Sequence, residues 1–450
     1  MSEVYELQYA VRPRQSNRWL LLLLFLPVFF LLIQPHEVTT TLTNPEWAAE
    51  KDVSANVGYT ESGNIRRQIA LVLLVGFAAM SLSLPSTQRM RLDPWLAGIA
   101  LFFAVWAFSS VVWAEQALVT MRKLTVFVIF GVSTYALARR NSPRELMTIV
   151  FAIGVFQVFV TGFLIELALG TFVPWALFYR FGGMLHPNCQ GDHVSVVFLA
   201  AMAFAMEKGR RWQFFAAFAG IALVLLFLTK SRGAVVGVVL ALGYCGAIGM
   251  SNIKKIWIAV AGIGLICCLC LAFGEESSRL ANTAVFLGRA DDSTNRGTLN
   301  SRLPLWKECI GQISDCPLTG VGYDSFWSAR RLAAISSTQD WSMATSHNAY
   351  LDIALGLGLI GGAAIVLVLG ATIFRLSQAY RQSRSPVDFF FCAFVIATCV
   401  RYFFESSFRD PTLPTFLVYI IVLRTALLSR WSRFVSKREC PSCVCSGLST

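Results

Sequence analysis

The amino-acid sequence predicts an all-α polytopic membrane protein with about twelve transmembrane helices and a large, partly helical external loop between helices 9 and 10. Hydrophobic residues make up 56% of the 450 residues and charged residues only 14%. A water-soluble core could not hide that much apolar surface. The apolar residues also fall into runs long enough to cross a bilayer, which takes about 17–25 residues.

The apolar runs divide the chain into four parts. The candidate spans, in chain order, are residues 19–34, 69–85, 95–112, 123–138, 147–170, 192–206, 213–229, 233–250, 255–274, 349–374, 388–404 and 412–429. A long segment, 275–346, separates the ninth span from the tenth, far beyond the usual connection length. We therefore expect transmembrane helices 1–9 within residues 1–274, a loop subdomain at 275–346, helices 10–12 within 347–429 and a tail at 430–450.

The placement of Lys and Arg predicts the orientation. Basic residues cluster in the short connections of one face, for example at Arg139-Arg140, Arg210-Arg211 and Lys254-Lys255. The positive-inside rule assigns this face to the cytoplasm, and an even number of spans puts both termini there. The net charge of +12 is thus mostly a topology signal. No basic stripe interleaved with aromatic residues appears, so nucleic acid is not an expected partner.

The loop subdomain is expected to be folded. Apolar residues recur at helical spacing from Leu303 to Ile313, and Cys316-Pro317 would end that helix. The sequence leaves open whether Cys309 and Cys316 form a disulfide or stay free thiols.

Basic residues on the external face are candidate anion ligands. Arg180, Lys230 and Arg232 lie in short external connections, against the charge asymmetry, and Arg302 lies at the start of the loop helix. The planar guanidinium binds phosphate oxygens in bidentate fashion, and a helix N-terminus favours an anion. The alternatives are structural. Arg232 could extend from a helix end to the interface, Arg302 could be one surface arginine among several, and Arg180 could make a cation–π contact with Tyr179 or Phe181.

His347 is the candidate general base. It lies at the external start of the tenth span, where its imidazole could take a proton from a hydroxyl; the alternative is an interfacial histidine bonded to backbone. Asp352 follows on the face of Asn348 and could orient a ligand or an arginine. Arg401 and Glu405, four residues apart, are expected to pair on one helix. No acidic or histidine cluster has metal-ligand spacing, so neither a metal nor another cofactor is expected.

These motifs resemble those of the O-antigen ligase and polysaccharide polymerase superfamily of bacterial envelopes. The ligase signature of that family is His, then Asn, Ser or Gln, nine residues, Gly, two residues, and Gly, Thr or Tyr. It is matched in register by His347, Asn348, Gly358 and Gly361. Other stretches that look like this family follow in the same order: His186-Pro187-Asn188, Ser231-Arg232-Gly233, Asn300-Ser301-Arg302 to Trp306, and the run from Pro317 to Gly322.

The resemblance implies a glycosyltransferase of the bacterial inner membrane with a periplasmic active site. The donor would be a glycan on undecaprenyl pyrophosphate. Its pyrophosphate would be held by Arg232 and Arg302, with Arg180, Lys230 and Ser231 nearby. His347 would take the proton of the acceptor hydroxyl, without a metal and with inversion at the anomeric carbon.

The acceptor separates the members of this superfamily. A ligase transfers the finished glycan to lipid A–core, whereas a polymerase transfers it to a second lipid-linked repeat unit. The signature favours a ligase, and a polymerase of O-antigen or exopolysaccharide is the alternative. A transporter of the same lipid-linked glycan would place its charges along a midplane cavity. Here the charges gather at one face, which disfavours transport.

Overall fold

The structure is a bundle of long apolar helices. The computed structural model describes residues 18–32, 65–84, 92–176, 179–248, 250, 299–339 and 345–427. Its longer helices are, in chain order, α1 (Arg18–Leu32), α4 (Ile65–Ser83), α5 (Pro94–Ser109), α6 (Ala117–Arg140), α7 (Pro143–Val155), α9 (Pro187–Met206), α10 (Trp212–Leu228), α11 (Arg232–Ala247), α14 (Leu299–Asp315), α15 (Ala329–Gln339), α16 (Ala349–Ser383), α17 (Pro386–Arg401) and α18 (Leu413–Leu427). A π-helix η3 (Phe156–Leu164) and the short α8 (Ile165–Ala168) continue α7, and single 3₁₀ turns form η2 (Ser110–Val112) and η4 (Ser407–Arg409). No strand occurs within these ranges, so the all-α class is confirmed for them.

Eleven of the twelve predicted spans coincide with helices. The ninth, 255–274, lies outside the described residues. Six helical stretches are long and apolar enough to cross a membrane, and α10, α11 and α18 are shorter apolar helices. The polytopic architecture is therefore confirmed, and the total of twelve spans stays a prediction.

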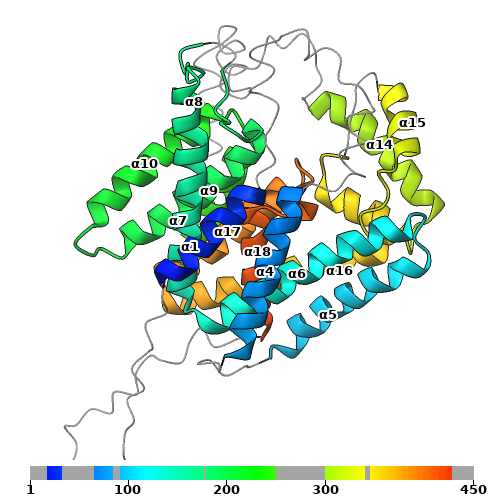
Figure 1. Cartoon of the computed structure of the whole chain (residues 1–450), viewed down its shortest axis with the longest axis horizontal. Coiled ribbons are helices and arrows are strands. Elements are labelled where there is room, and N and C mark those ends of the chain that lie inside the picture. The colour runs from blue at the N-terminus through cyan, green and yellow to red at the C-terminus, as the bar shows by residue number, and fades with distance from the viewer. Residues whose placement is uncertain are drawn as a thin grey trace, which may run out of the picture.

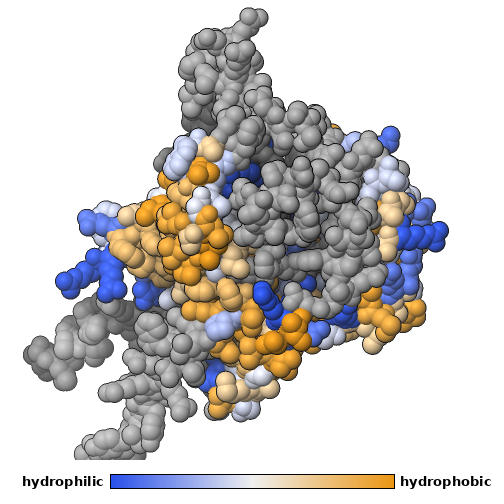
Figure 2. Space-filling model, turned by 45° about the horizontal axis from the view of Figure 1, so that its top comes forward, coloured by the Kyte–Doolittle hydropathy of each residue, from blue (hydrophilic) through white to orange (hydrophobic). Residues whose placement is uncertain are grey.

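The outer surface of the bundle suits lipid. Large apolar side chains are exposed on several helices, among them Val72 of α4 at 69%, Leu101 of α5 at 64% and Val239 of α11 at 60%. On the face seen in Figure 2, hydrophobic residues form broad areas and hydrophilic residues gather toward the margins. Such areas are unfavourable in water but match the hydrocarbon core of a bilayer, where every helical backbone bond is satisfied internally.

Three helices, α9, α11 and α17, approach closely near one end of the bundle. A Cβ on Gly191 of α9 would lie 2.9 Å from Cβ of Ser231, and one on Gly237 of α11 would lie 2.7 Å from the carbonyl oxygen of Ala397 in α17. Glycine thus lets these backbones pack more tightly than a side chain would allow. The starts of α9, α11 and α16 and the end of α17 lie at one end of the bundle, which we call the site end.

The predicted loop helix is present. It is α14, which ends at Asp315, just before Cys316-Pro317. A small core of α14, α15 and the turn between them includes Leu305, Leu332 and Trp327, and it also contains Leu355 of α16. Figure 1 shows α14 and α15 together at one side of the bundle. Cys309 and Cys316 are free thiols.

The long α16 is broken inside its span. Gly358 has φ +66° and ψ −174°, a conformation essentially restricted to glycine. The break frees backbone groups, and the turn after α14 binds them: Val321 and Gly322 donate to the carbonyls of Leu355 and Gly356, and Leu359 donates to the carbonyl of Pro317. Trp106 Nε1 of α5 donates to the Leu357 carbonyl at 2.9 Å. Non-helical backbone is tolerated at membrane depth only when it is satisfied in this way.

Candidate functional site

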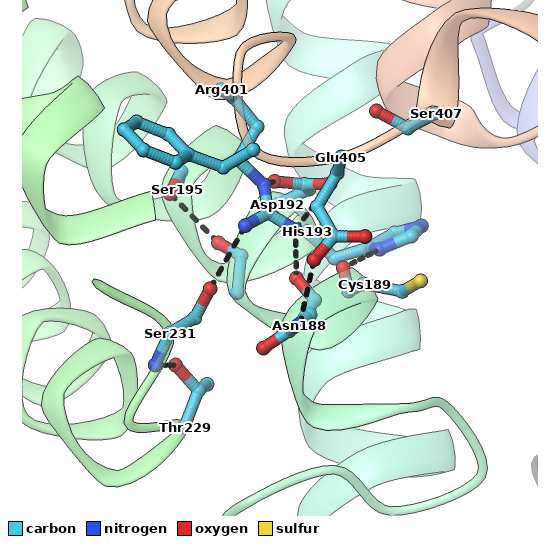
Figure 3. Close-up of polar contacts among 12 residues, drawn as sticks. Asn188, Cys189, Asp192, His193, Ser195, Thr229, Ser231, Arg401, Glu405 and Ser407 are labelled. Atoms are coloured by element: carbon cyan, nitrogen blue, oxygen red, sulfur yellow. Dashed lines mark hydrogen bonds and ion pairs between the residues drawn. The ribbon is translucent and has the colours of Figure 1, made fainter. Parts of the chain in front are cut away.

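Glu405 lies at the centre of a group of polar side chains at the site end, which we call the polar cluster. Its other members are Asn188, Arg180, Arg302 and His347. Glu405 lies in the turn between α17 and η4, and its side chain is 15% exposed. Its Oε1 accepts a hydrogen bond from Nδ2 of Asn188, in the first turn of α9, at 2.7 Å. Figure 3 shows these two side chains beside Arg401 and Asp192. The two residues stand 217 positions apart in the sequence, so the fold creates this contact.

Two of the predicted anion ligands reach this pair. Arg302 of α14 donates from Nη1 to the carbonyl oxygen of Phe404 at 2.6 Å, and its Nη2 lies 3.5 Å from Oε1 of Glu405. Arg180 donates from Nη2 to Oδ1 of Asn188 at 2.6 Å and from Nε to the carbonyl of Thr229 at 3.1 Å. Asn188 therefore bridges Arg180 and Glu405 with opposite ends of its amide.

His347 also faces Glu405. Its Nδ1 lies 3.5 Å from Oε2 of Glu405, a distance that allows charge interaction but is long for a hydrogen bond. The imidazole is 28% exposed, so one side of it stays accessible. His347 has φ +52°, a left-handed conformation unusual for a residue other than glycine. It immediately precedes α16, whose N-cap is Asn348.

Neighbouring residues hold His347 in this conformation. The Asn348 side chain accepts hydrogen bonds from the backbone N–H of Tyr350 and Leu351. On the other side, the carbonyl of Ser346 accepts from Trp306 Nε1 at 2.9 Å, and its N–H donates to Oδ1 of Asp352 at 3.2 Å. The alternatives left open for Asp352 were a ligand and an arginine. Its Oδ1 contacts Trp327 and the backbone of Ser346, so it orders the segment that presents His347, and a ligand role for Asp352 stays a prediction.

The charge of Glu405 is fixed by its surroundings. Burial raises the pKa of its carboxyl, but contact with His347 and the charges of Arg401 and Arg302 lower it by more, so the net pKa lies well below the ordinary value. Glu405 therefore stays ionised across the physiological range. An anion held among cations orients them and keeps them from repelling one another.

Arg401 does not pair with Glu405 as the four-residue spacing predicted. Its guanidinium forms an ion pair with Asp192 of α9, donates from Nη1 to Oγ of Ser231 at 3.0 Å and from Nη2 to the carbonyl of Asn188 at 2.6 Å. The prediction was wrong because α17 ends at Arg401, so Glu405 no longer lies on the same helix face. The arginine acts as a buried tie between α9, α11 and α17, visible in Figure 3.

Ser231 thus has a defined role at the start of α11. It is the N-cap residue of α11 and is 1% exposed. Lys230 has φ +49° and lies two residues after the end of α10, donating its N–H to the carbonyl of Phe227 at 2.9 Å. Arg232 is the first residue of α11. Both cations therefore flank a serine that is bonded to Arg401, which places them at the site end with Arg180 and Arg302.

The loop that carries Arg180 is anchored by a buried carboxylate that the sequence left unassigned. Glu166 of α8 accepts hydrogen bonds at Oε1 from the backbone N–H of Gly182 and Gly183, and at Oε2 from the hydroxyl of Tyr179. Gly183 has φ +59°, and a Cβ there would lie 2.3 Å from Cα of Gly162 in η3. A π-helix is rare and often marks a functional site. Here it receives the loop that presents Arg180.

Close packing explains why the two signature positions, Gly358 and Gly361, are glycine. A Cβ on Gly358 would lie 2.2 Å from the carbonyl group of Leu318, and one on Gly361 would lie 2.2 Å from Cβ of Leu357. These positions shape α16 behind His347 and do not touch the polar cluster directly. Within the described residues, no group of three or more His, Cys, Asp or Glu side chains could hold a metal ion.

Comparisons with known proteins support the resemblance. Residues 215–366 match the O-antigen ligase family, a segment that includes Lys230, Arg232, Arg302, His347 and both signature glycines. The exopolysaccharide production protein ExoQ of Rhizobium meliloti is 23% identical over 254 residues. That alignment covers 53% of this chain and 56% of ExoQ, so the chain spans about half the length of this relative. The resemblance to the O-antigen ligase and polymerase superfamily is thereby confirmed.

Proposed function

We propose that this protein transfers a glycan from undecaprenyl pyrophosphate to an acceptor hydroxyl at the periplasmic face of the bacterial inner membrane. The observation that carries the proposal is the convergence of Arg180, Arg302 and His347 on the Asn188–Glu405 pair at one end of an apolar bundle. Cations that bind phosphate oxygens lie within one polar cluster with a group that can accept a proton. Glycan transfer from a pyrophosphate needs both.

The proposed chemistry is a direct displacement. The acceptor oxygen attacks the anomeric carbon, the bond from that carbon to the pyrophosphate oxygen breaks, and the leaving pyrophosphate takes the electron pair. Its growing negative charge is stabilised by Arg232 and Arg302, with Arg180 and Lys230 supporting them. Attack from the face opposite the leaving group inverts the anomeric configuration.

In this proposal, His347 is the general base that takes the proton from the acceptor hydroxyl. Its Nδ1 faces Glu405, which favours the tautomer with the hydrogen on Nδ1 and leaves Nε2 to accept the proton. Glu405, ionised throughout, then stabilises the imidazolium that forms. Glu405 is thus a positioning residue for both His347 and Arg302, and no metal is required for the charge balance.

Two acceptors fit this chemistry. The ligase signature at His347, Asn348, Gly358 and Gly361 favours lipid A–core, which makes a ligase our first proposal. The name of the relative, an exopolysaccharide production protein, favours a polymerase that uses a second lipid-linked repeat unit. The reaction at the anomeric carbon is the same in both.

The lipid-linked glycans of a deletion strain separate these acceptors. A missing ligase leaves long polysaccharide chains on undecaprenyl pyrophosphate, whereas a missing polymerase leaves single repeat units. Complementation with wild type should remove the accumulated species, and complementation with His347→Asn should not. Unchanged lipid-linked glycans in the deletion strain would contradict both assignments. Loss of in vitro transfer on adding a chelator would mean that a metal ion, and not the arginines alone, stabilises the leaving pyrophosphate.

A further inference from the structure

A buried ion pair joins the helices that carry the donor-site cations. Arg401, at the end of α17, contacts both carboxylate oxygens of Asp192 in α9 through Nε and Nη2 (Figure 3). The side chain of Arg401 is 5% exposed and that of Asp192 is 13% exposed. Taking two charges out of water is costly, and replacing such a pair by apolar side chains is often neutral for stability. Stability alone therefore does not explain this pair.

On one side, the pair holds the start of α11, which carries two of the cations. Arg401 Nη1 donates to Oγ of Ser231 at 3.0 Å, and Ser231, the N-cap of α11, lies between Lys230 and Arg232. A serine at an N-cap commonly accepts a hydrogen bond from the helix backbone, but the Ser231 side chain makes no such bond. A Cβ on Gly233 would lie 3.1 Å from the same Nη1, so the first turn of α11 packs directly on the guanidinium. The serine hydroxyl thus places α11 instead of capping it.

On the other side, the pair holds the two residues on which Arg180 and Arg302 converge. Arg401 Nη2 donates to the carbonyl of Asn188 at 2.6 Å, and the carbonyl of Arg401 accepts the backbone N–H of Glu405 at 3.0 Å. The Asn188 side chain contacts Arg180, and that of Glu405 contacts Arg302. Arg401 therefore fixes the start of α11 relative to the Asn188–Glu405 pair. It thereby fixes one group of cations relative to the other.

We propose that Asp192 and Arg401 are positioning residues that set the separation between these two groups of cations, and that this separation selects a lipid pyrophosphate over a lipid monophosphate. A pyrophosphate carries two phosphoryl groups at a fixed spacing, so both cation groups can contact it only while their own spacing is kept. A single phosphate can be bound by either group alone. The selectivity rests on the proposed transferase function, because the two cation groups are those assigned to the donor.

The test is equilibrium binding of undecaprenyl pyrophosphate and of undecaprenyl phosphate to the purified full-length protein. Wild type should bind the pyrophosphate more tightly, and the ratio of the two Kd values is the pyrophosphate preference. Arg401→Lys keeps a charge beside Asp192, but an ammonium cannot also contact Ser231 and Asn188 with a rigid planar fork. The affinity for the pyrophosphate should fall about 10-fold, since a charge-assisted contact is lost, and that for the monophosphate should stay within about twofold. In transfer assays the donor KM should rise while the acceptor KM stays unchanged.

A paired substitution separates positioning from folding. Asp192→Leu combined with Arg401→Met removes both charges together, whereas a single neutral substitution leaves one buried charge without its partner. The double variant should unfold near the wild-type temperature and still lose the pyrophosphate preference. Arg144→Lys is the matched control, because Arg144 of α7 makes the same two-bond contact with Glu207, at the opposite end of α9. This control should keep the wild-type preference.

Wild-type preference in both Arg401→Lys and the double variant would overturn the positioning role. Equal losses of affinity for the two lipids would also overturn it, because a general disturbance of the fold weakens both alike, and so would the absence of any preference in wild type. If neither variant folds, Ser231→Ala decides, since it deletes the hydroxyl that Arg401 contacts and leaves the ion pair intact. Failure of the transferase proposal gives a different result: the preference would still depend on Arg401, but His347→Asn would retain transfer.

Discussion

The two ends of the bundle use buried arginines differently. At the end opposite the site, Arg424 of α18 is 7% exposed and donates from Nη1 to the carbonyls of Ala138 and Asn141, at the C-terminal end of α6. Such contacts satisfy the last carbonyls of a helix and stabilise its dipole. At the site end, Arg302 and Arg180 reach a carboxylate and an amide that are shared with other residues. All three arginines bind backbone carbonyls, but Arg302 and Arg180 also converge on side chains that they share with other residues, which makes these two the candidates for a functional site.

Backbone conformation sets His347 apart from the left-handed residues that follow helices, which include Lys230 at the site end. Lys208 and Arg384 have φ of +49° and +51°, and each lies just after a helix, α9 and α16, where left-handed residues are common. His347, at φ +52°, comes before a helix, where that explanation does not apply. A left-handed conformation persists at such a position only when its surroundings impose it. Trp306, Asp352 and Asn348 do so here.

The largest effect is expected from removing the imidazole at the site end. His347→Asn should lower transfer by about 10²–10⁴-fold, the range for loss of a general base. Asparagine is chosen because it tolerates the left-handed backbone better than alanine. Folding and donor binding should therefore be retained. Transfer rates are measured with lipid-linked donor and purified acceptor, and a near-wild-type rate would remove His347 from the mechanism.

Arg302→Lys is expected to have the next largest effect on the rate. The charge is kept, but an ammonium cannot contact Phe404, Glu405 and a pyrophosphate with a rigid fork. Loss of a contact to the leaving group lowers the rate by about 10²–10³-fold. Arg330→Lys, on the exposed surface of α15, is the matched control and should keep wild-type transfer. Equal behaviour of the two variants would contradict the assignment of Arg302 to pyrophosphate.

Gly358→Ala should show that part of the family signature is architectural. The new Cβ would meet backbone atoms of Leu318 at 2.2 Å, and the φ of +66° is unfavourable for alanine. We expect a loss of about 3 kcal/mol or more in unfolding free energy, from strain and displaced backbone. Gly362→Ala is the control, since its Cβ would meet only Ala354, at 3.6 Å. Thermal unfolding compares the two; similar stability would mean that the break in α16 accommodates a side chain.

Hydropathy predicted the helices because lipid exposure requires apolar residues at the bundle surface. The start of the loop helix and its end near Cys316-Pro317 were predicted for the same local reasons, namely apolar period and a breaker. The break at Gly358 was not predicted. The break is stabilised by hydrogen bonds from the turn at 317–322. That turn lies far from Gly358 along the chain, so only the fold brings the two together.

The site was only partly predictable. Charge asymmetry and the family motifs predicted Arg180, Lys230, Arg232, Arg302 and His347 as site residues. The structure brings Arg180, Arg302 and His347 to the Asn188–Glu405 pair. Glu405 was expected in a structural pair, because the spacing rule assumes a continuous helix and α17 ends before it. Asn188 lies in a stretch that resembles the family, but the sequence predicted no role for it. Its partners, Arg180 and Glu405, come from other segments that only the fold brings close. Glu166 had no sequence signal beyond being a carboxylate in an apolar span.

The smallest effect is expected at the opposite end, from Arg424→Lys. One ammonium on a flexible stem cannot reproduce the geometry that reaches the carbonyls of Ala138 and Asn141. The free energy of unfolding should fall by about 1–2 kcal/mol, the cost of losing buried hydrogen bonds to a charged donor. Transfer per folded molecule should stay within about twofold of wild type, because additive effects are expected between distant sites. Arg381→Lys, exposed near the same end of α16, controls for the substitution itself. A loss of transfer in Arg424→Lys at unchanged stability would mean that the two ends of the bundle are coupled, and the distinction between architectural and functional arginines would fail.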